Sequence, residues 1–162
     1  MDPQKVERDG QRDFDFLIGD WNVRNQRLRH PLSQSDEWYE FDSSVSTRPL
    51  WNGKGNVEEY VGTSPIATLE GFALRLYDPL RACWSIYWGT AQHGLTVVPN
   101  VGSFNSEGVG DFYSDELFTG TPIVCRYRWT QKYGNGCRWE QAFSTDNGGT
   151  WETNWIMDFT RQ

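Results

Sequence analysis

The sequence predicts an all-β fold, a single antiparallel up-and-down β-barrel of about eight to ten strands with a short N-terminal helical turn. Three observations lead to this prediction. Short aromatic and β-branched runs alternate with turn residues, as at Gly134-Asn135-Gly136 and Asp146-Asn147-Gly148-Gly149, a pattern typical of hairpin-linked strands. No long segment has the 3.6-residue periodicity of an amphipathic helix. Aromatic residues make up 15% of the 162 residues, and aromatic side chains favour strands.

A barrel is favoured over a β-sandwich because the predicted connections are mostly short hairpins, without long Greek-key excursions. A connected meander closes naturally, and closure removes the exposed edge strands that promote aggregation. A barrel of this size also leaves room inside for one small ligand.

The elements follow in order along the chain. Residues 1–12 are polar and charged without periodicity, and we expect a flexible tail there. Residues 13–162 form the predicted barrel domain. Its first element is one helical turn, for which Asp13 would cap the start and Gly19 would end the last turn. We then expect strands at residues 20–29, 36–47, 56–61, 71–78, 82–89, 101–105, 109–118, 123–131, 137–145 and 150–161.

Two features at opposite ends of this domain carry a family resemblance. Gly19-Asp20-Trp21 opens the first predicted strand, and Arg161 ends the last one. A cation stacks favourably on a tryptophan face. In this arrangement the chain resembles the lipocalin and calycin superfamily, where a Gly-x-Trp follows a short helical turn. The resemblance implies that Trp21 closes one end of the barrel and that Arg161 packs across its ring.

Residues 13–161 more closely resemble a bacterial family of uncharacterised calycin-like proteins. The matching segments are Asp15-Phe16-Leu17-Ile18-Gly19-Asp20-Trp21, Leu74-Arg75-Leu76-Tyr77-Asp78-Pro79, Trp84-Ser85-Ile86-Tyr87-Trp88 and Arg138-Trp139-Glu140-Gln141-Ala142-Phe143-Ser144. The superfamily resemblance implies a barrel that holds a hydrophobic small molecule. Some members bind haem or fatty acids, and others are cofactor-free lyases or cyclases of bacterial pigment and natural-product pathways. Haem-binding members use a histidine from a late strand, whereas His30 and His93 both lie earlier, so haem is not expected.

Strand alternation predicts which side chains face inward. If Trp21 faces inward, Val23, Asn25 and Arg27 do so too. The last three strands give a consistent inner set: Cys125, Tyr127, Trp129, Gln131, Cys137, Trp139, Gln141, Phe143, Trp151, Thr153, Trp155, Met157, Phe159 and Arg161. The facing within residues 56–89 stays open because both faces carry apolar or aromatic residues. One interpretation is an outer-wall interface in a homodimer.

The predicted ligand-binding residues combine aromatic walls with a few polar groups, as a small-molecule pocket requires. They are Asn25, Arg27, Tyr60, Trp88, Tyr127, Trp129, Gln141 and Trp155. Glu58 and His93 are the candidate catalytic acid or base residues. The alternatives are that the polar atoms satisfy one another in a filled barrel, that Glu58 pairs with an inward arginine, and that His93 is an exposed loop residue.

The pattern Ser144-x-Asp146-x-Gly148-x-Thr150-Trp151 matches the Asp-box of sialidase propellers. Its physical basis is a hairpin in which the carboxylate accepts hydrogen bonds from turn amides. A propeller needs several such boxes at a regular period, and the sequence has no internal repeat. We therefore predict a structural turn.

Composition excludes several functions. The net charge of −7 disfavours nucleic acids and anionic membranes as partners. No segment approaches the ~20 apolar residues of a membrane-spanning helix. The absence of an apolar N-terminal run and the three unpatterned cysteines favour the cytoplasm. No metal or other cofactor is expected, because no phosphate-loop or metal-ligand spacing occurs.

Three functional hypotheses follow. The leading one is a barrel that binds a hydrophobic, ring-containing small molecule. The first alternative is a cofactor-independent cyclase, isomerase or lyase that folds a natural-product-like substrate against the aromatic wall. The second alternative is an oligomeric structural domain whose barrel is filled by its own side chains.

Overall fold

A computed structural model describes residues 9–131 and 134–162. Its elements are the 3-10 turns η1 (Gly10–Arg12), η2 (Asp15–Leu17) and η3 (Trp51–Gly53) and the strands β1 (Gly19–Leu28), β2 (Trp38–Leu50), β3 (Gly55–Thr63), β4 (Thr68–Asp78), β5 (Cys83–Thr90), β6 (Gly94–Leu95), β7 (Asn100–Phe104), β8 (Val109–Phe118), β9 (Thr121–Gln131), β10 (Gly136–Ser144) and β11 (Glu152–Arg161). Each predicted strand is present within a few residues of its expected bounds; the two-residue β6 was not predicted.

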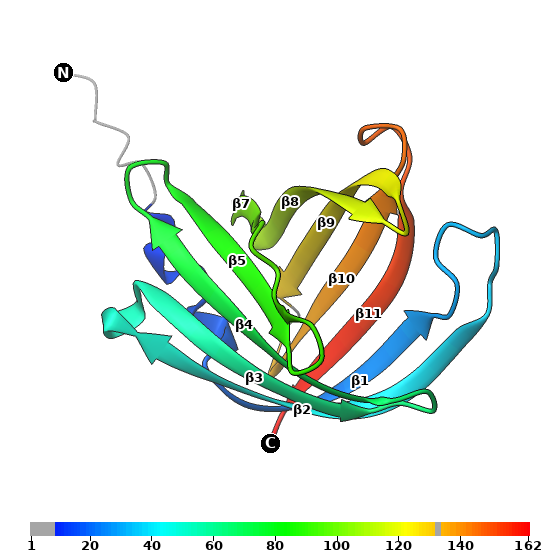
Figure 1. Ribbon diagram of the computed structural model, residues 1–162. Helices are drawn as coiled ribbons and strands as arrows, with labels where there is room; N and C mark the ends of the chain where they lie inside the picture. The colour runs from blue at the N-terminus through cyan, green and yellow to red at the C-terminus, as the bar shows by residue number, and fades with distance from the viewer. Residues whose placement is uncertain (1–8, 132–133) are drawn as a thin grey trace.

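The strands form one closed, antiparallel meander. Each long strand pairs with the next in the chain, β5 pairs with β7 beside the short β6, and β11 returns to pair with β1. Figure 1 shows this course from β1 in blue to β11 in red, until the two lie side by side. Because the sheet closes, every long strand pairs with a neighbouring strand along both of its edges. The predicted up-and-down barrel is confirmed.

The N-terminal segment packs into one end of the barrel. Phe14 is buried and meets Trp84 and Phe104 edge-to-face, each with ring centroids 5.0 Å apart. The Trp84 indole donates a hydrogen bond of 2.9 Å to the carbonyl of Gly10. Of the predicted tail, residues 1–8 lie outside the described residues, whereas Gly10–Arg12 forms η1. The predicted Asp13 cap is wrong, because the N-cap residue of η2 is Phe14 and has no side-chain cap hydrogen bond.

The predicted contact between Trp21 and Arg161 is present at this closed end. The Arg161 guanidinium lies 4.0 Å from the centroid of the Trp21 ring and donates hydrogen bonds to the carbonyls of Phe16 and Ile18. The Trp21 indole donates to the carbonyl of Leu17 at 2.9 Å. The first and last strands are thereby joined to the turn that precedes β1.

Burial follows the predicted alternation along β1, β9 and most of β10 and β11. The register of β10 and β11 shifts at the open end: Gln141 pairs with Trp155 and Ala142 with Thr153, so Asn154 is an extra residue of β11 and interrupts the alternation there. Asn154, which alternation from Trp155 places outside, is therefore buried. Trp151, predicted to face inward, instead lies before β11 and stacks on the outward Arg126 at 4.4 Å.

Two further predicted inward residues, Gln131 and Arg161, end their strands and are exposed. Side chains at a strand end are not covered by neighbouring strands, so alternation does not predict burial there.

The structure shows which side chains within residues 56–89 point into the barrel, a question that the sequence left open. The inner side of β3, β4 and β5 carries Asn56, Glu58, Tyr60, Ala73, Arg75, Trp84, Ile86 and Trp88. Outer residues such as Val57, Leu74 and Tyr87 are half-buried. The homodimer suggested by this second apolar face stays a prediction.

The Asp-box residues form a hydrogen-bonded turn between β10 and β11. The Asp146 carboxylate accepts hydrogen bonds from the Thr150 amide at 2.7 Å and from the hydroxyls of Thr150 and Ser144 at 2.8 Å. The Ser144 hydroxyl accepts in turn from the Gly148 amide at 2.8 Å. These bonds stabilise the charged form and lower the pKa of Asp146 to about 2.

Replacing Asp146 with alanine should lower the midpoint of denaturant unfolding at pH 7. The pKa of Asp146 is lower in the folded state than its ordinary value of 3.8. The contribution of this carboxylate to folding stability is therefore full above pH 3.8 and is lost as the pH falls through about 2. The difference between wild type and variant should therefore shrink from pH 5 towards pH 2. Asp115→Ala, an exposed change on β8, is the control, and a difference that is constant with pH would contradict the assignment.

Candidate functional site

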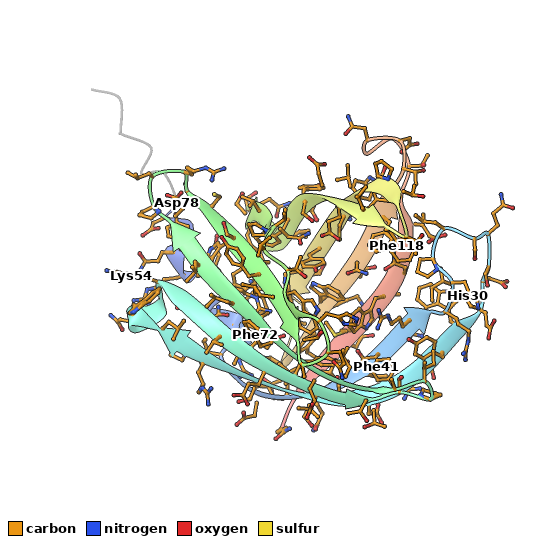
Figure 2. All side chains as sticks on the ribbon, viewed as in Figure 1. His30, Phe41, Lys54, Phe72, Asp78 and Phe118 are labelled. Carbon is orange, nitrogen blue, oxygen red and sulfur yellow. The ribbon has the colours of Figure 1, made fainter. Side chains whose placement is uncertain are left out.

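The barrel encloses a cavity of about 190 Å³. Its lining residues Arg75 and Trp129 pack against Phe14, and Thr96, Val98 and Glu116 line it near the end of β8. Figure 2 shows how densely side chains from the surrounding strands fill the space around it. Its lining residues are Arg27, Glu58, Tyr60, Ala73, Arg75, Ile86, Trp88, Thr96, Val98, Asn100, Glu116, Tyr127, Trp129, Trp139, Gln141, Trp155 and Met157.

The cavity continues into a wider groove at the open end of the barrel. Thr96, Val98 and Glu116 line both spaces. The groove has a volume of about 860 Å³ and runs between these residues, the hairpin of β8 and β9, and the turn after β10.

The structure brings together most residues predicted to bind a ligand. Seven of them, Arg27, Tyr60, Trp88, Tyr127, Trp129, Gln141 and Trp155, line the cavity. Alternation placed Arg27, Tyr127, Trp129, Gln141 and Trp155 on the inner face, whereas it had left the facing of Tyr60 and Trp88 open. Their role in binding stays a prediction.

Asn25 lies behind the cavity wall instead of in it. It is fully buried, and its amide oxygen accepts hydrogen bonds of 3.0 Å from both the Tyr60 hydroxyl and the Trp155 indole. Its amide nitrogen donates to the Ser43 hydroxyl at 2.8 Å. Asn25 thus holds two aromatic wall residues in fixed orientations.

The tyrosines of the wall are neutral hydroxyl donors near neutral pH. Burial raises the pKa of Tyr60 to about 12, and the hydrogen bond with Ser43 only partly offsets this effect. Burial also raises the pKa of Tyr127 well above its ordinary value. A neutral phenol adds apolar ring area to the cavity and one polar atom that can orient a ligand.

Neither histidine reaches the cavity. His93 is exposed in the connection between β5 and β6, where its backbone amide donates to the Thr90 hydroxyl at 3.1 Å. Figure 2 shows His30 in the loop between β1 and β2, outside the barrel. The interpretation of His93 as an exposed loop residue matches its position.

Glu58 lies at the floor of the cavity and forms a buried ion pair with Arg75. The Arg75 guanidinium donates to the Glu58 carboxylate at 2.7 Å and to the Asn56 amide oxygen at 3.0 Å. The two charged side chains are only 3% and 4% exposed. Arg75 also lies over the rings of Phe14 and Trp129 at 5.3 and 5.4 Å. The alternative of an inward arginine partner for Glu58 is thus the observed one.

Sequence reasoning missed several cavity residues. Arg75 was ambiguous because both faces of β4 carry apolar side chains. Glu116 is one of several acidic residues on β8, and nothing in the sequence distinguishes it from the outward Asp115. Thr96 and Val98 lie in an irregular segment, where strand alternation makes no prediction.

Two negative findings apply to the described residues. No three His, Cys, Asp or Glu side chains in residues 9–131 and 134–162 lie together as a metal-binding group. No helix in the same part of the chain is long and apolar enough to cross a bilayer.

Comparison with known proteins supports the fold. No protein-family model and no curated protein matches the sequence. The chain is similar to the S-type phycobiliprotein lyase CPES from Guillardia theta, with a TM-score of 0.64 and 10% identity over 99% of this chain and 98% of that chain. It is also similar to Rv2717c from M. tuberculosis, with a TM-score of 0.63 and 11% identity over 96% of this chain and 98% of that chain. These likenesses confirm the predicted calycin-like β-barrel fold.

Proposed function

We propose that this calycin-like β-barrel binds a hydrophobic, ring-containing small molecule, with the rings inside the barrel. The observation that carries the proposal is the cavity of about 190 Å³ walled by Tyr60, Trp88, Tyr127, Trp139 and Trp155. Aromatic walls supply apolar contact area, and the few polar groups among them orient a ligand. The cavity also argues against a barrel filled completely by its own side chains.

The size of the cavity limits what fits inside. Pockets for drug-sized ligands commonly measure ~300–1,000 Å³, so a volume of about 190 Å³ accommodates only a compact ring system. A larger ligand would place one end in the cavity and extend through the mouth into the adjoining groove. We therefore expect an elongated molecule in preference to a bulky one.

A second candidate function is cofactor-independent lyase or isomerase chemistry on the bound molecule. One structural neighbour is named a phycobiliprotein lyase, and two carboxylates, Glu58 and Glu116, line the cavity of this chain. A carboxylate within reach of a bound ring can transfer protons. Glu116 is the better candidate for proton transfer, because Glu58 is already paired with Arg75.

The binding proposal is tested by filling the cavity. Ala73 is buried, lines the cavity and lies opposite Trp88 in the register of β4 and β5. Ala73→Phe should weaken binding of the fluorescent probe N-phenyl-1-naphthylamine by at least about tenfold, a loss of about 1.4 kcal/mol. Leu74→Phe, the adjacent change on the outer face, should leave the affinity within about twofold of wild type, a difference below 0.5 kcal/mol.

A second variant, at the cavity mouth, distinguishes loss of binding from a folding defect in Ala73→Phe. Thr96 lines the mouth, whereas its neighbour Val97 is 76% exposed. Thr96→Trp should weaken probe binding, and Val97→Trp should not. Equal affinities in wild type, Ala73→Phe and Thr96→Trp would place the probe elsewhere and contradict the proposal.

Native mass spectrometry of protein from its own host would show the natural ligand. Conversion of that ligand on incubation with the protein, lost in Glu116→Gln, would establish the lyase candidate.

A further inference from the structure

Arg27 is the positively charged residue at the side of the cavity mouth. It lies near the end of β1, pairs in register with Tyr39 and Trp155, and lines the cavity. Its guanidinium lies 4.2 Å from the centroid of the Trp155 ring. Since Trp155 is itself held by Asn25, the arginine rests on a fixed aromatic surface and keeps its planar donor edge available.

Arg27 has no polar partner among the described residues. Three outward arginines of the same barrel differ: Arg24 pairs with Glu40, Arg128 forms two hydrogen bonds with Asp111, and Arg138 forms two with Asp158. The chain has 22 acidic and 15 basic residues, so carboxylates are plentiful. Arg126 on the outer face also has no carboxylate partner among the described residues, and it stacks on Trp151. Arg27 is the half-buried guanidinium without a carboxylate that lines the cavity.

The other charges of the cavity do not neutralise Arg27. Glu58 is paired with Arg75 at the floor. Glu116 projects from β8, four strands away from β1 in the order of the closed sheet, and accepts a hydrogen bond from Ser114 at 2.5 Å. Tyr60 on β3 and Tyr39 on β2, the residues that face Arg27 from these strands, offer it no carboxylate. The mouth is positive beside β1 and β11 and negative beside β8.

We infer that Arg27 binds an oxyanion of the ligand, a carboxylate or a group of the same chemistry. This inference rests on the proposed function. A guanidinium presents parallel N–H donors that match the two oxygens of such a group. The ligand is then an amphipathic, ring-containing anion. Its rings occupy the aromatic cavity, and its charged group lies at the mouth on the side of β1, away from Glu116.

Two probes that differ in one anionic group test the inference. 8-Anilinonaphthalene-1-sulfonate has the ring system of N-phenyl-1-naphthylamine plus a sulfonate. Arg27→Gln should weaken binding of the sulfonate probe about tenfold more than it weakens binding of the neutral probe, as expected for loss of one charge-assisted hydrogen-bonding group. Arg27→Lys should retain part of the affinity for the sulfonate. Arg24→Gln, the same change on the outer face of β1, is the matched control and should affect neither probe.

The outcomes separate the inference from the proposed function. An Arg27→Gln variant that binds both probes as wild type does, or loses both equally, overturns the oxyanion site while ligand binding stands. Equal loss would mean that Arg27 only supports the Trp155 ring. If neither probe binds the wild-type protein, the proposed function fails and the oxyanion site fails with it. Unfolding midpoints of the three variants check that each is folded.

Discussion

Replacing Glu58 with glutamine should destabilise the barrel by about 3–5 kcal/mol, because it leaves the buried Arg75 without its counter-ion. Glu58 and Arg75 are 3% and 2% exposed, so water cannot replace the lost carboxylate. Arginine keeps its charge at any accessible pH, and the cost therefore cannot be avoided by deprotonation. Urea-induced unfolding followed by tryptophan fluorescence measures the effect.

The neighbouring residue offers a matched control. Glu59 points outward and pairs with Arg48 at 3.3 Å, and both side chains are about two-thirds exposed at 66% and 65%. Glu59→Gln removes the same charge but should cost only about 0–1 kcal/mol. The double replacement Glu58→Gln and Arg75→Met should recover much of the stability lost in Glu58→Gln, because no unpaired charge remains. Similar unfolding midpoints for Glu58→Gln and Glu59→Gln would show that the buried pair contributes no more than a surface pair.

Replacing Phe14 with alanine should cost about 3–5 kcal/mol, the usual range for removing a fully buried aromatic ring. Phe14 is 1% exposed and contacts the rings of Trp84, Phe104, Phe112 and Trp129. The loss combines transfer free energy with the cavity that remains between these rigid rings. Differential scanning calorimetry or urea unfolding provides the measurement.

Phe16 is the natural comparison, because it has the same side chain two residues later. It is only partly buried and packs at the edge of the same aromatic cluster. Phe16→Ala should therefore cost clearly less than Phe14→Ala. If the two variants unfold at the same midpoint, the N-terminal segment is not the plug that the packing indicates.

Much of the barrel could be predicted from the sequence because its signals are local. Turn residues with short loops mark the hairpins, and period-two alternation marks the strands. The pairing of Trp21 with Arg161 is long-range, and it was implied by the resemblance to the lipocalin and calycin superfamily and not by local patterning. Alternation also placed Arg27, Tyr127, Trp129, Gln141 and Trp155 on the inner face, because each of their strands has one clearly more apolar side.

Local signals failed where the regular pattern is interrupted or is the same on both faces. Asn154 is the extra residue of a bulge in β11 opposite Gln141 and Ala142, and it is buried although alternation places it outside. Arg75 lies on a strand with apolar residues on both sides. His93 lies in an irregular connection, and a sequence cannot show whether such a loop folds over a cavity or away from it.

The fold class and the strand bounds, to within a few residues, could be read from the amino-acid sequence, because they depend on short-range patterning and turn chemistry. Tertiary structure alone decided the chemistry of the interior. Asn25 supports Trp155 from a position 130 residues away, and Glu58 is neutralised by Arg75 while Arg27 stays unpaired. Such partnerships depend on which side chains meet when a ring of strands closes, and the spacing along the chain does not encode that meeting.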